Sequence, residues 1–275
     1  MVLEDRIVIK SSDRLFLYID ILGFTEMLEE PEKIEKLYRK INSLSVFDHS
    51  ENYECIVFSD TILIYDMRDL SDNEEEANRS IMWLCEFAQD LFYRLISTDR
   101  HFRGLLTFGD FQSKGLKNIK YFYGKALVET YSYESKIHST ELYIDNRISR
   151  KSDIFKTRKY DNKFSYVYLT QNLGQIIDSL EFGESYLAAE ILDGDAHWLY
   201  AYDFVYLNNV NRNMNDLSLT GAVRSKYLNT WHLLEQEYGK VITILRGNAF
   251  DPSFVIGIDW TESLDRVKSG AGFHG

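Results

Sequence analysis

The sequence predicts an α+β fold in which a central, mainly antiparallel sheet is flanked by helices and followed by a C-terminal helical extension. Three observations support it: a buried-looking strand that runs into a tight turn and a helix, two β-rich runs that form a hairpin, and long helical patterns over 71–98 and 217–245. The 275 residues can bury the core of one large domain, or of one domain with an appendage, without covalent staples.

The first element is a strand over residues 15–22 (LFLYIDIL), whose apolar run is interrupted by one acid, Asp20. Gly23, Phe24 and Thr25 then turn the chain into a helical pattern over 26–45, which is interrupted near Pro31. This arrangement places a carboxylate at the end of a buried strand.

A hairpin comes next, over residues 53–65 (YECIVFSDTILIY), with its hinge at Ser59 and Asp60. The helix predicted over 71–98 follows, with Ser71 as its cap and acidic residues in its first turn. The hairpin therefore carries a second acid, Asp60, at its tip.

Residues 103–111 (RGLLTFGDF) predict a central strand that Arg103 opens, and a glycine turn after Tyr121 leads into another helix. Strands are predicted over 141–145, 164–169 and 197–207, with helical material over 173–192. The polar stretch 208–216 (NNVNRNMND) is typical of a connection, and 269–275 are expected to fray. The predicted domains are therefore 1–207 and a C-terminal helical extension, 208–275.

Composition excludes several classes of protein. The formal net charge of −12 argues against nucleic-acid binding through clustered cations, and no apolar run is long enough to cross a membrane. With no signal-peptide pattern, and with Cys55 and Cys85 expected to be buried thiols, we expect a cytoplasmic protein. The histidines show no zinc-ligand spacing, and Asp193, Asp195 and His197 are expected to form a solvated turn.

Asp20, Asp60 and Arg103 together form a candidate site, because each is a charged residue in or beside a predicted strand. Carboxylates inside apolar strands are costly to bury unless they are paired or bind a cation. Two such acids on neighbouring strands could share hard divalent ions, Mn²⁺ or Mg²⁺, whose preferred ligands are oxygens. Taken singly, each acid could instead accept hydrogen bonds from backbone amides of its turn, and Arg103 could pair with a surface acid.

The stretches FLYIDILGFTEM, FSDTILI, RGLLTFG and YFYGKALVETYSYESK resemble the motifs of class III nucleotidyl cyclases, over about residues 12–140. The resemblance implies a ferredoxin-like cyclase fold. It also implies that Asp20, Asp60 and the backbone carbonyl of Ile21 bind two Mn²⁺ or Mg²⁺ ions. Arg103 and the backbone amides of Gly23, Phe24 and Thr25 would bind the triphosphate.

The sequence departs from that pattern at several positions. Ile56 and Tyr121 occupy the two base-reading positions, Val128 and Ser132 stand where the family has its transition-state Asn and Arg, and the glycine after Arg103 falls one place early. The sequence motif IDILGF, together with the RG and GKALVETYSYE stretches, is most similar to motifs of the pyrimidine cyclases of bacterial Pycsar anti-phage systems. An aromatic side chain at Tyr121 would narrow the base pocket.

This resemblance implies a homodimer with active sites at its interface, which converts UTP or CTP to cyclic UMP or cyclic CMP for a separate effector protein. UTP is favoured on resemblance alone. The alternatives are a catalytically silent nucleotide-binding module, a purine (adenylate) cyclase, or a related palm-type polymerase or diguanylate cyclase. The absence of a Gly-Gly-Asp-Glu-Phe-like hairpin and the negative charge weigh against the last of these.

Overall fold

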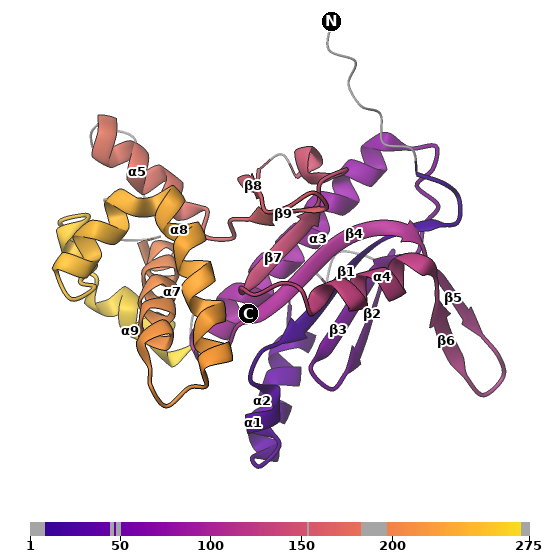
Figure 1. Ribbon diagram of the computed structural model, residues 1–275, viewed down its shortest axis with the longest axis horizontal. Coiled ribbons are helices and arrows are strands. Elements are labelled where there is room, and N and C mark those ends of the chain that lie inside the picture. The colour runs from indigo at the N-terminus through magenta and orange to yellow at the C-terminus, as the bar shows by residue number, and fades with distance from the viewer. Residues whose placement is uncertain (1–8, 45–46, 48–50, 153, 183–196, 271–275) are drawn as a thin grey trace, which may run out of the picture. The chain divides into compact units, whose positions relative to one another are not determined.

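The computed structural model describes residues 9–44, 47, 51–152, 154–182 and 197–270 (Figure 1). The chain forms two compact units. The first contains the described residues within Met1–Phe92, Phe102–Ile137 and Glu141–Leu169, and the second contains those within Tyr93–His101, His138–Thr140 and Thr170–Gly275.

The first unit is built on a seven-stranded sheet with the order β2-β3-β1-β4-β7-β9-β8. Every neighbouring pair is antiparallel except β4 and β7, which are parallel. The prediction of an α+β fold with a mainly antiparallel central sheet is therefore confirmed. The strands are β1 (Asp13–Ile21), β2 (Tyr53–Phe58), β3 (Thr61–Asp66), β4 (Phe102–Asp110), β7 (Glu141–Asp145), β8 (Thr157–Lys159) and β9 (Phe164–Val167).

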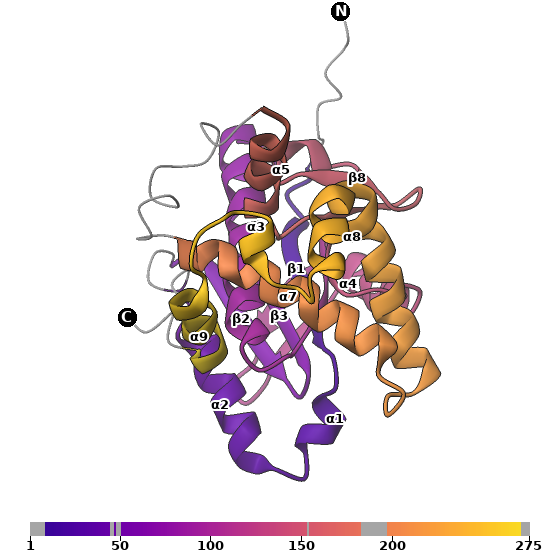
Figure 2. The same cartoon turned by 90° about the vertical axis from the view of Figure 1, so that its left-hand side faces the viewer.

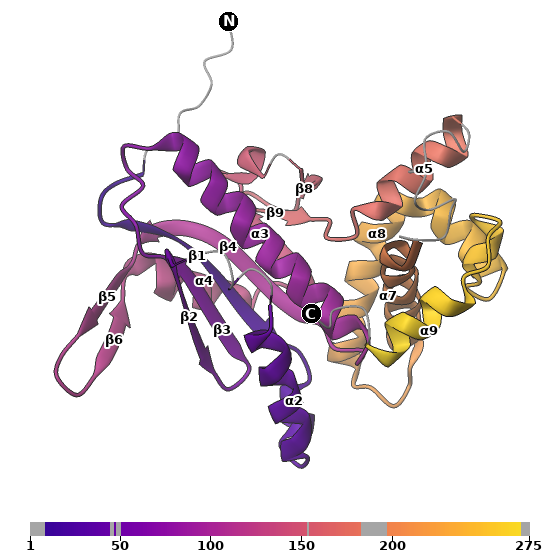
Figure 3. The ribbon, with the colours of Figure 1, turned by 180° about the vertical axis from the view of Figure 1, so that it is seen from behind.

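Helices cover both faces of this sheet. Figure 3 shows α3 (Glu74–Ile96) running along one face, and Figure 1 shows α4 (Lys125–Glu134) on the other, where it packs on β4. A separate hairpin, β5 (Gln112–Gly115) and β6 (Lys120–Tyr123), precedes α4. The described part of this unit also contains α1 (Phe24–Met27), α2 (Pro31–Asn42) and the short η2 (Ser149–Lys151).

The start of α3 differs from the prediction. The side-chain carbonyl of Asn73 accepts a hydrogen bond of 3.1 Å from the amide of Glu76, so Asn73 and not Ser71 caps the helix. One face of α3 belongs to the core, and these side chains on it are fully buried: Ile81, Leu84, Cys85, Ala88 and Leu91. Cys55 is only partly buried, unlike Cys85, because β2 is an edge strand.

The second unit is helical and contains α5 (Asn172–Phe182), α7 (His197–Asn215), α8 (Gly221–Gly247), η4 (Pro252–Phe254) and α9 (Thr261–Ser269). Helix α7 contacts α5, α8 and α9 (Figure 2). The helix predicted over 217–245 is confirmed as α8, and that over 173–192 as α5 as far as Phe182. The remainder of that segment, with Asp193, Asp195 and 271–275, lies outside the described residues.

The strand predicted over 197–207 and the connection predicted over 208–216 are both wrong, because α7 spans them. The helix is buried on more than one side, so no helical period is visible, and aromatic residues favoured a strand. Asn209 and Asn213, one helical turn apart, are buried and hydrogen-bond to Ile96 and Asp99. The boundary predicted between 207 and 208 falls inside this helix.

Among the described helices, none has both the length and the apolar composition of a membrane span.

Candidate active site

The end of β1 and the tip of the β2–β3 hairpin are joined by backbone hydrogen bonding. Asp20 lies opposite Thr61 of β3, and the amide of Ile21 donates to the carbonyl of Asp60 over 2.9 Å. Ser59, just before Asp60, has a positive φ of 56° that shapes the tight hairpin. The structure thus brings together the chain segments that carry the two predicted metal acids.

Arg103 lies beside the same site, because β4 pairs Arg103 directly with Asp20. Its Nη2 donates to Asp20 Oδ2 over 2.9 Å, and its Nη1 donates to the carbonyl of Ile137 over 2.9 Å. The same Nη2 also forms an ion pair with Glu134, at the end of α4. Arg103 is 8% exposed, so its guanidinium is a buried cation held between two carboxylates.

Burial lowers the pKa of Arg103, and the charge of Asp20 opposes that shift. A guanidinium nevertheless stays protonated in proteins, so the cation persists. The site therefore contains three carboxylates, from Asp20, Asp60 and Glu134, and one fixed positive charge. Its local charge is negative, which favours a bound cation.

Two tyrosines border the acids. Tyr18 precedes Asp20 by two residues and so shares its face of the sheet. Its Oη lies 3.5 Å from Oγ1 of Thr61, and its ring meets that of Tyr131 of α4 edge-on, with 6.4 Å between centroids. Burial raises the pKa of Tyr18, and the negative charges of Asp20 and Asp60 act in the same direction.

The oxygen donors at this site are of the kind that Mn²⁺ and Mg²⁺ prefer, and the excess of carboxylates over cations also fits such an ion. Within the described ranges no group of three or more His, Cys, Asp and Glu residues is arranged to hold a metal. A two-carboxylate site fits Mg²⁺ because this ion commonly keeps waters and takes substrate phosphates as further ligands.

The turn after Asp20 forms as predicted. Gly23 has a φ of 73°, in the left-handed region that glycine adopts without strain, and α1 begins at Phe24. Phe24 packs its side chain into the core, while Gly23 and Thr25 are exposed. Phosphate binding by the backbone of this turn stays a prediction.

Ile56 and Tyr121 lie on separate elements, β2 and β6. Side chains alternate along β6: Phe122 contacts Tyr65 and Lys120 pairs with Glu54 of β2, whereas Tyr121 stacks on Tyr123 at 6.0 Å. Within this chain, Tyr121 therefore belongs to the side of the hairpin opposite that of Phe122. A base pocket made by Ile56 and Tyr121 stays a prediction.

Helix α4 turns two of the substituted positions outward. Val128 is 64% exposed, and exposed Ser132 donates its hydroxyl to the carbonyl of Val128. Gly124, with a φ of 151°, leads into this helix, and a Cβ there would overlap the carbonyl oxygen of Asp110. The close approach of backbone at Gly124 thus fixes where α4 begins.

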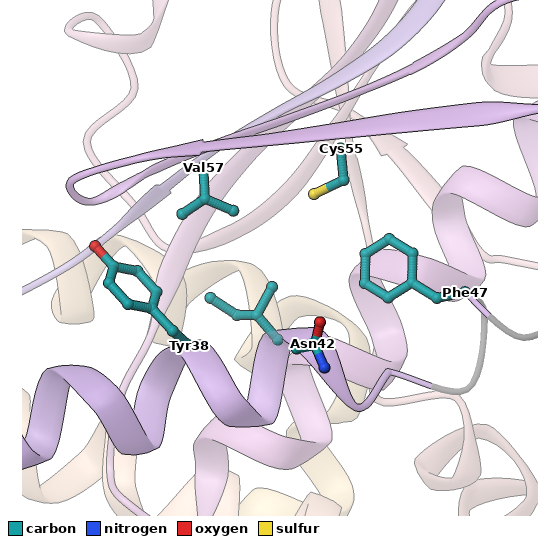
Figure 4. A pocket seen from close by; sticks show the side chains of 6 residues that line it. Tyr38, Asn42, Phe47, Cys55 and Val57 are labelled. Carbon is teal, nitrogen blue, oxygen red and sulfur yellow. The ribbon is translucent and has the colours of Figure 1, made fainter.

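A cavity of about 590 Å³ lies between α2 and β2 (Figure 4). Among the described residues, those that line it are Tyr38, Ile41, Asn42, Phe47, Cys55 and Val57. Cys55 and Val57 alternate with Ile56 along β2, so the cavity lies on the sheet face opposite to that of Ile56. Tyr38 Oη donates to the carbonyl of Ser59 over 3.0 Å, which ties α2 to the hairpin tip beside Asp60.

Sequence reasoning missed Tyr18, Tyr131 and Glu134. A usable signal existed for Glu134, because it follows Thr130, which is buried, by one helical turn on α4. An acid on the inner stripe of a helix is expensive unless a cation faces it. The free-energy cost of burying Glu134 therefore predicts a cationic partner such as Arg103.

No family model matches the sequence, and no curated protein matches it. Three solved structures illustrate the similarity found. The guanylyl cyclase domain of the RhoGC fusion protein from the aquatic fungus Blastocladiella emersonii is 15% identical, with 56% of this chain and 93% of that chain covered and a TM-score of 0.43.

The adenylyl cyclase CyaB from P. aeruginosa is 14% identical, with 57% and 93% covered and a TM-score of 0.40. A bacterial light-regulated adenylyl cyclase is 10% identical, with 64% and 98% covered and a TM-score of 0.42. At these identities and scores, the likeness alone assigns no activity to this chain.

Proposed function

We propose that the chain is a class III nucleotidyl cyclase that converts a pyrimidine nucleoside triphosphate, UTP or CTP, to the 3′,5′-cyclic monophosphate and pyrophosphate. One observation carries the proposal. The segments bearing Asp20 and Asp60 are hydrogen-bonded at the end of an antiparallel sheet, and Arg103 lies in register with Asp20. The sequence motifs around these residues support the same activity.

In this proposal the carboxylates of Asp20 and Asp60, with the backbone carbonyl of Ile21, hold two Mn²⁺ or Mg²⁺ ions. When bound, such ions supply Lewis acidity at the reacting phosphate and neutralise charge on the leaving pyrophosphate. Arg103 supplies a fixed positive charge for the triphosphate. The amides of Gly23, Phe24 and Thr25 bind phosphate oxygens.

Base selectivity is assigned to Ile56 and Tyr121. Ile56 has no polar group that could read a purine edge, and the ring of Tyr121 narrows the space for a base. UTP and CTP share the single ring that such a pocket takes. We favour UTP on the sequence resemblance.

The active form is proposed to be a homodimer that places a base-reading surface of one chain over the metal acids of the other. Apolar side chains around the site are exposed in the single chain, which supports a surface that a second chain covers in the dimer. Phe58 at the hairpin tip is 79% exposed, Tyr131 is 66% exposed and Val128 is 64% exposed. The cyclic product would act through a separate effector protein in anti-phage defence.

A second candidate is a silent nucleotide-binding module. It is favoured by the ion pairs that already engage Arg103, and by Val128 and Ser132 at the positions of the expected Asn and Arg. The requirement for two costly carboxylates argues for catalysis.

Incubation of the purified protein with ATP, GTP, CTP and UTP in turn, with Mn²⁺, tests the proposal by mass spectrometry of cyclic product and pyrophosphate. A cyclic pyrimidine product is expected. A purine product would overturn the base assignment. Nucleotide binding in the absence of any product would favour the silent module.

A further inference from the structure

We propose that Glu134 is a positioning residue, which keeps Arg103 in place and charge-compensated when Asp20 exchanges its ion pair with Arg103 for a divalent cation. The inference rests on the proposed metal site and names a residue that the motif comparison left without a role. It starts from a shared contact: Nη2 of Arg103 meets both Asp20 and Glu134.

The geometry brackets the guanidinium from three sides. Asp20 approaches from β1 and Glu134 from the last turn of α4, while the carbonyl of Ile137, beyond that helix, accepts from Nη1. The side chains of Asp20, Glu134 and Arg103 are 18%, 14% and 10% exposed, so water screens these charges poorly. One buried cation is therefore held by two buried anions.

Two anions exceed what one guanidinium needs. A cation bound by Asp20 would draw that carboxylate away from Arg103 and place a second positive charge beside it. If Arg103 had no other partner, it would then be a buried, uncompensated cation next to a metal, which is a costly arrangement. Because Glu134 pairs with the same nitrogen, Arg103 can keep its charge balance and its position while Asp20 binds the metal.

A merely structural role for Glu134 would be to fasten the end of α4 to the sheet. Helix α4 already has other contacts with the sheet, since it packs on β4, the ring of Tyr131 meets that of Tyr18 on β1, and the ring of Tyr133 packs on Phe164 of β9. The two roles differ in what they predict for metal affinity. If the role of Glu134 is only structural, its substitution changes the stability of the protein alone. If Glu134 is a positioning residue, its substitution weakens metal binding while the fold is unchanged.

The test is Mn²⁺ titration of the purified protein without nucleotide, followed by electron paramagnetic resonance, with circular dichroism as the check on folding. Glu134→Gln should weaken Mn²⁺ binding by about 10-fold to 100-fold, the usual effect of changing a residue that supports a metal site from outside its ligands. Glu134→Asp keeps a carboxylate and should recover most of the affinity. Glu129→Gln, which removes an exposed acid of the same helix that pairs with Lys125 and Lys163, should bind like the wild type.

A second comparison separates action through Arg103 from direct attraction of the metal by Glu134. In an Arg103→Met background, Glu134→Gln should cause no further loss of Mn²⁺ affinity. A full loss in that background, or wild-type affinity in Glu134→Gln with only a lowered melting temperature, would overturn the proposal. If Arg103→Met does not fold, the same comparison is made in an Arg103→Gln background.

These readouts need no turnover, so they are distinct from the test of the proposed function. If the wild type binds Mn²⁺ but cyclises none of the four nucleotides, the cyclase proposal fails and the role of Glu134 is still decided by the titration. If the wild type does not bind Mn²⁺ without nucleotide, the role of Glu134 fails, whereas the cyclase proposal is still decided by the product assay.

Discussion

The amide of Ile21 donates a 2.9 Å hydrogen bond to the carbonyl of Asp60, which closes the end of β1 against the hairpin tip. The bond fixes backbone to backbone, so it survives any change of the acidic side chains. Substitution of either carboxylate should therefore alter the chemistry of the site without displacing its strands.

Asp20→Asn and Asp60→Asn should each reduce cyclase turnover below about 1% of the wild-type value, since each removes a proposed metal ligand. Asp20→Asn leaves Arg103 paired with Glu134, so the protein should stay folded. Steady-state assays with Mn²⁺, accompanied by circular dichroism, check the prediction. Substantial activity in either variant would remove the two-metal assignment.

Arg103→Met should lower the free energy of unfolding by about 3–5 kcal/mol, the usual effect of leaving buried charges without their partner. Here the stranded groups are the carboxylates of Asp20 and Glu134. Urea unfolding followed by circular dichroism measures the loss. Arg79→Met is a matched control, because Arg79 is exposed and its ion pairs within the described residues are with Glu75 and Glu76 of its own helix. It should cost about 0–1 kcal/mol.

Tyr38→Phe should loosen the hairpin tip by deleting the hydrogen bond to the carbonyl of Ser59. A bond of this kind contributes about 0.5–1.5 kcal/mol, so local opening should become about 2–10 times more frequent. Hydrogen exchange of a peptide spanning 55–65, read by mass spectrometry, reports it. Tyr123→Phe, on β6, should leave that peptide unchanged, and equal exchange in both variants would show that the tip does not depend on Tyr38.

Gly124→Ala should destabilise the first unit by about 1–3 kcal/mol, because the residue would combine an unfavourable φ with a clash against the carbonyl of Asp110. Gly115→Ala on β5 is the control, since a Cβ there meets nothing within 4 Å. Thermal unfolding compares the two variants. A Gly124→Ala protein as stable as Gly115→Ala would show that α4 adjusts freely.

Stability should fall between about pH 10 and pH 12. Burial raises the pKa of Tyr53 to about 12, whereas an unfolded tyrosine titrates near 10. Below pH 10 the phenol is neutral in both states and its contribution is complete; as the pH rises towards 12, only the unfolded state gains by ionising. Urea unfolding at pH 8, 10 and 11 measures the decline, and Tyr53→Phe should make it shallower.

The first unit was largely predictable because its strands show their burial in sequence. The run containing Asp20 and the hairpin around Asp60 have apolar residues on both sides of a turn signal, so their elements and their acids followed directly. Pairing between β1 and β4, which brings Arg103 to Asp20, joins residues far apart in the chain. The sequence analysis did not predict this pairing, and the motif resemblance assigned Arg103 only to the triphosphate.

The failures have physical causes as well. Helix α7 is buried on several sides, so its aromatic residues gave no helical period, and its polar end is stabilised by tertiary partners such as Asp99. Propensity favoured a strand and then a loop, and packing overrode both. Glu134 was missed because the partner that explains its burial, Arg103, lies on a strand that precedes the β5–β6 hairpin.

The second unit includes two short segments, 93–101 and 138–140, that pack against α7 and α8. The ribosome synthesises these segments well before it synthesises the two helices. His101 rests against the rings of Tyr206 and Tyr227, and the hydroxyl of Thr140 lies 3.0 Å from that of Thr230. During synthesis the chain therefore passes through a stage in which all the strands that the structure describes have emerged while these contacts are still unmade. A gene truncated near residue 169 would leave the protein at that stage, exposed to chaperones and self-association.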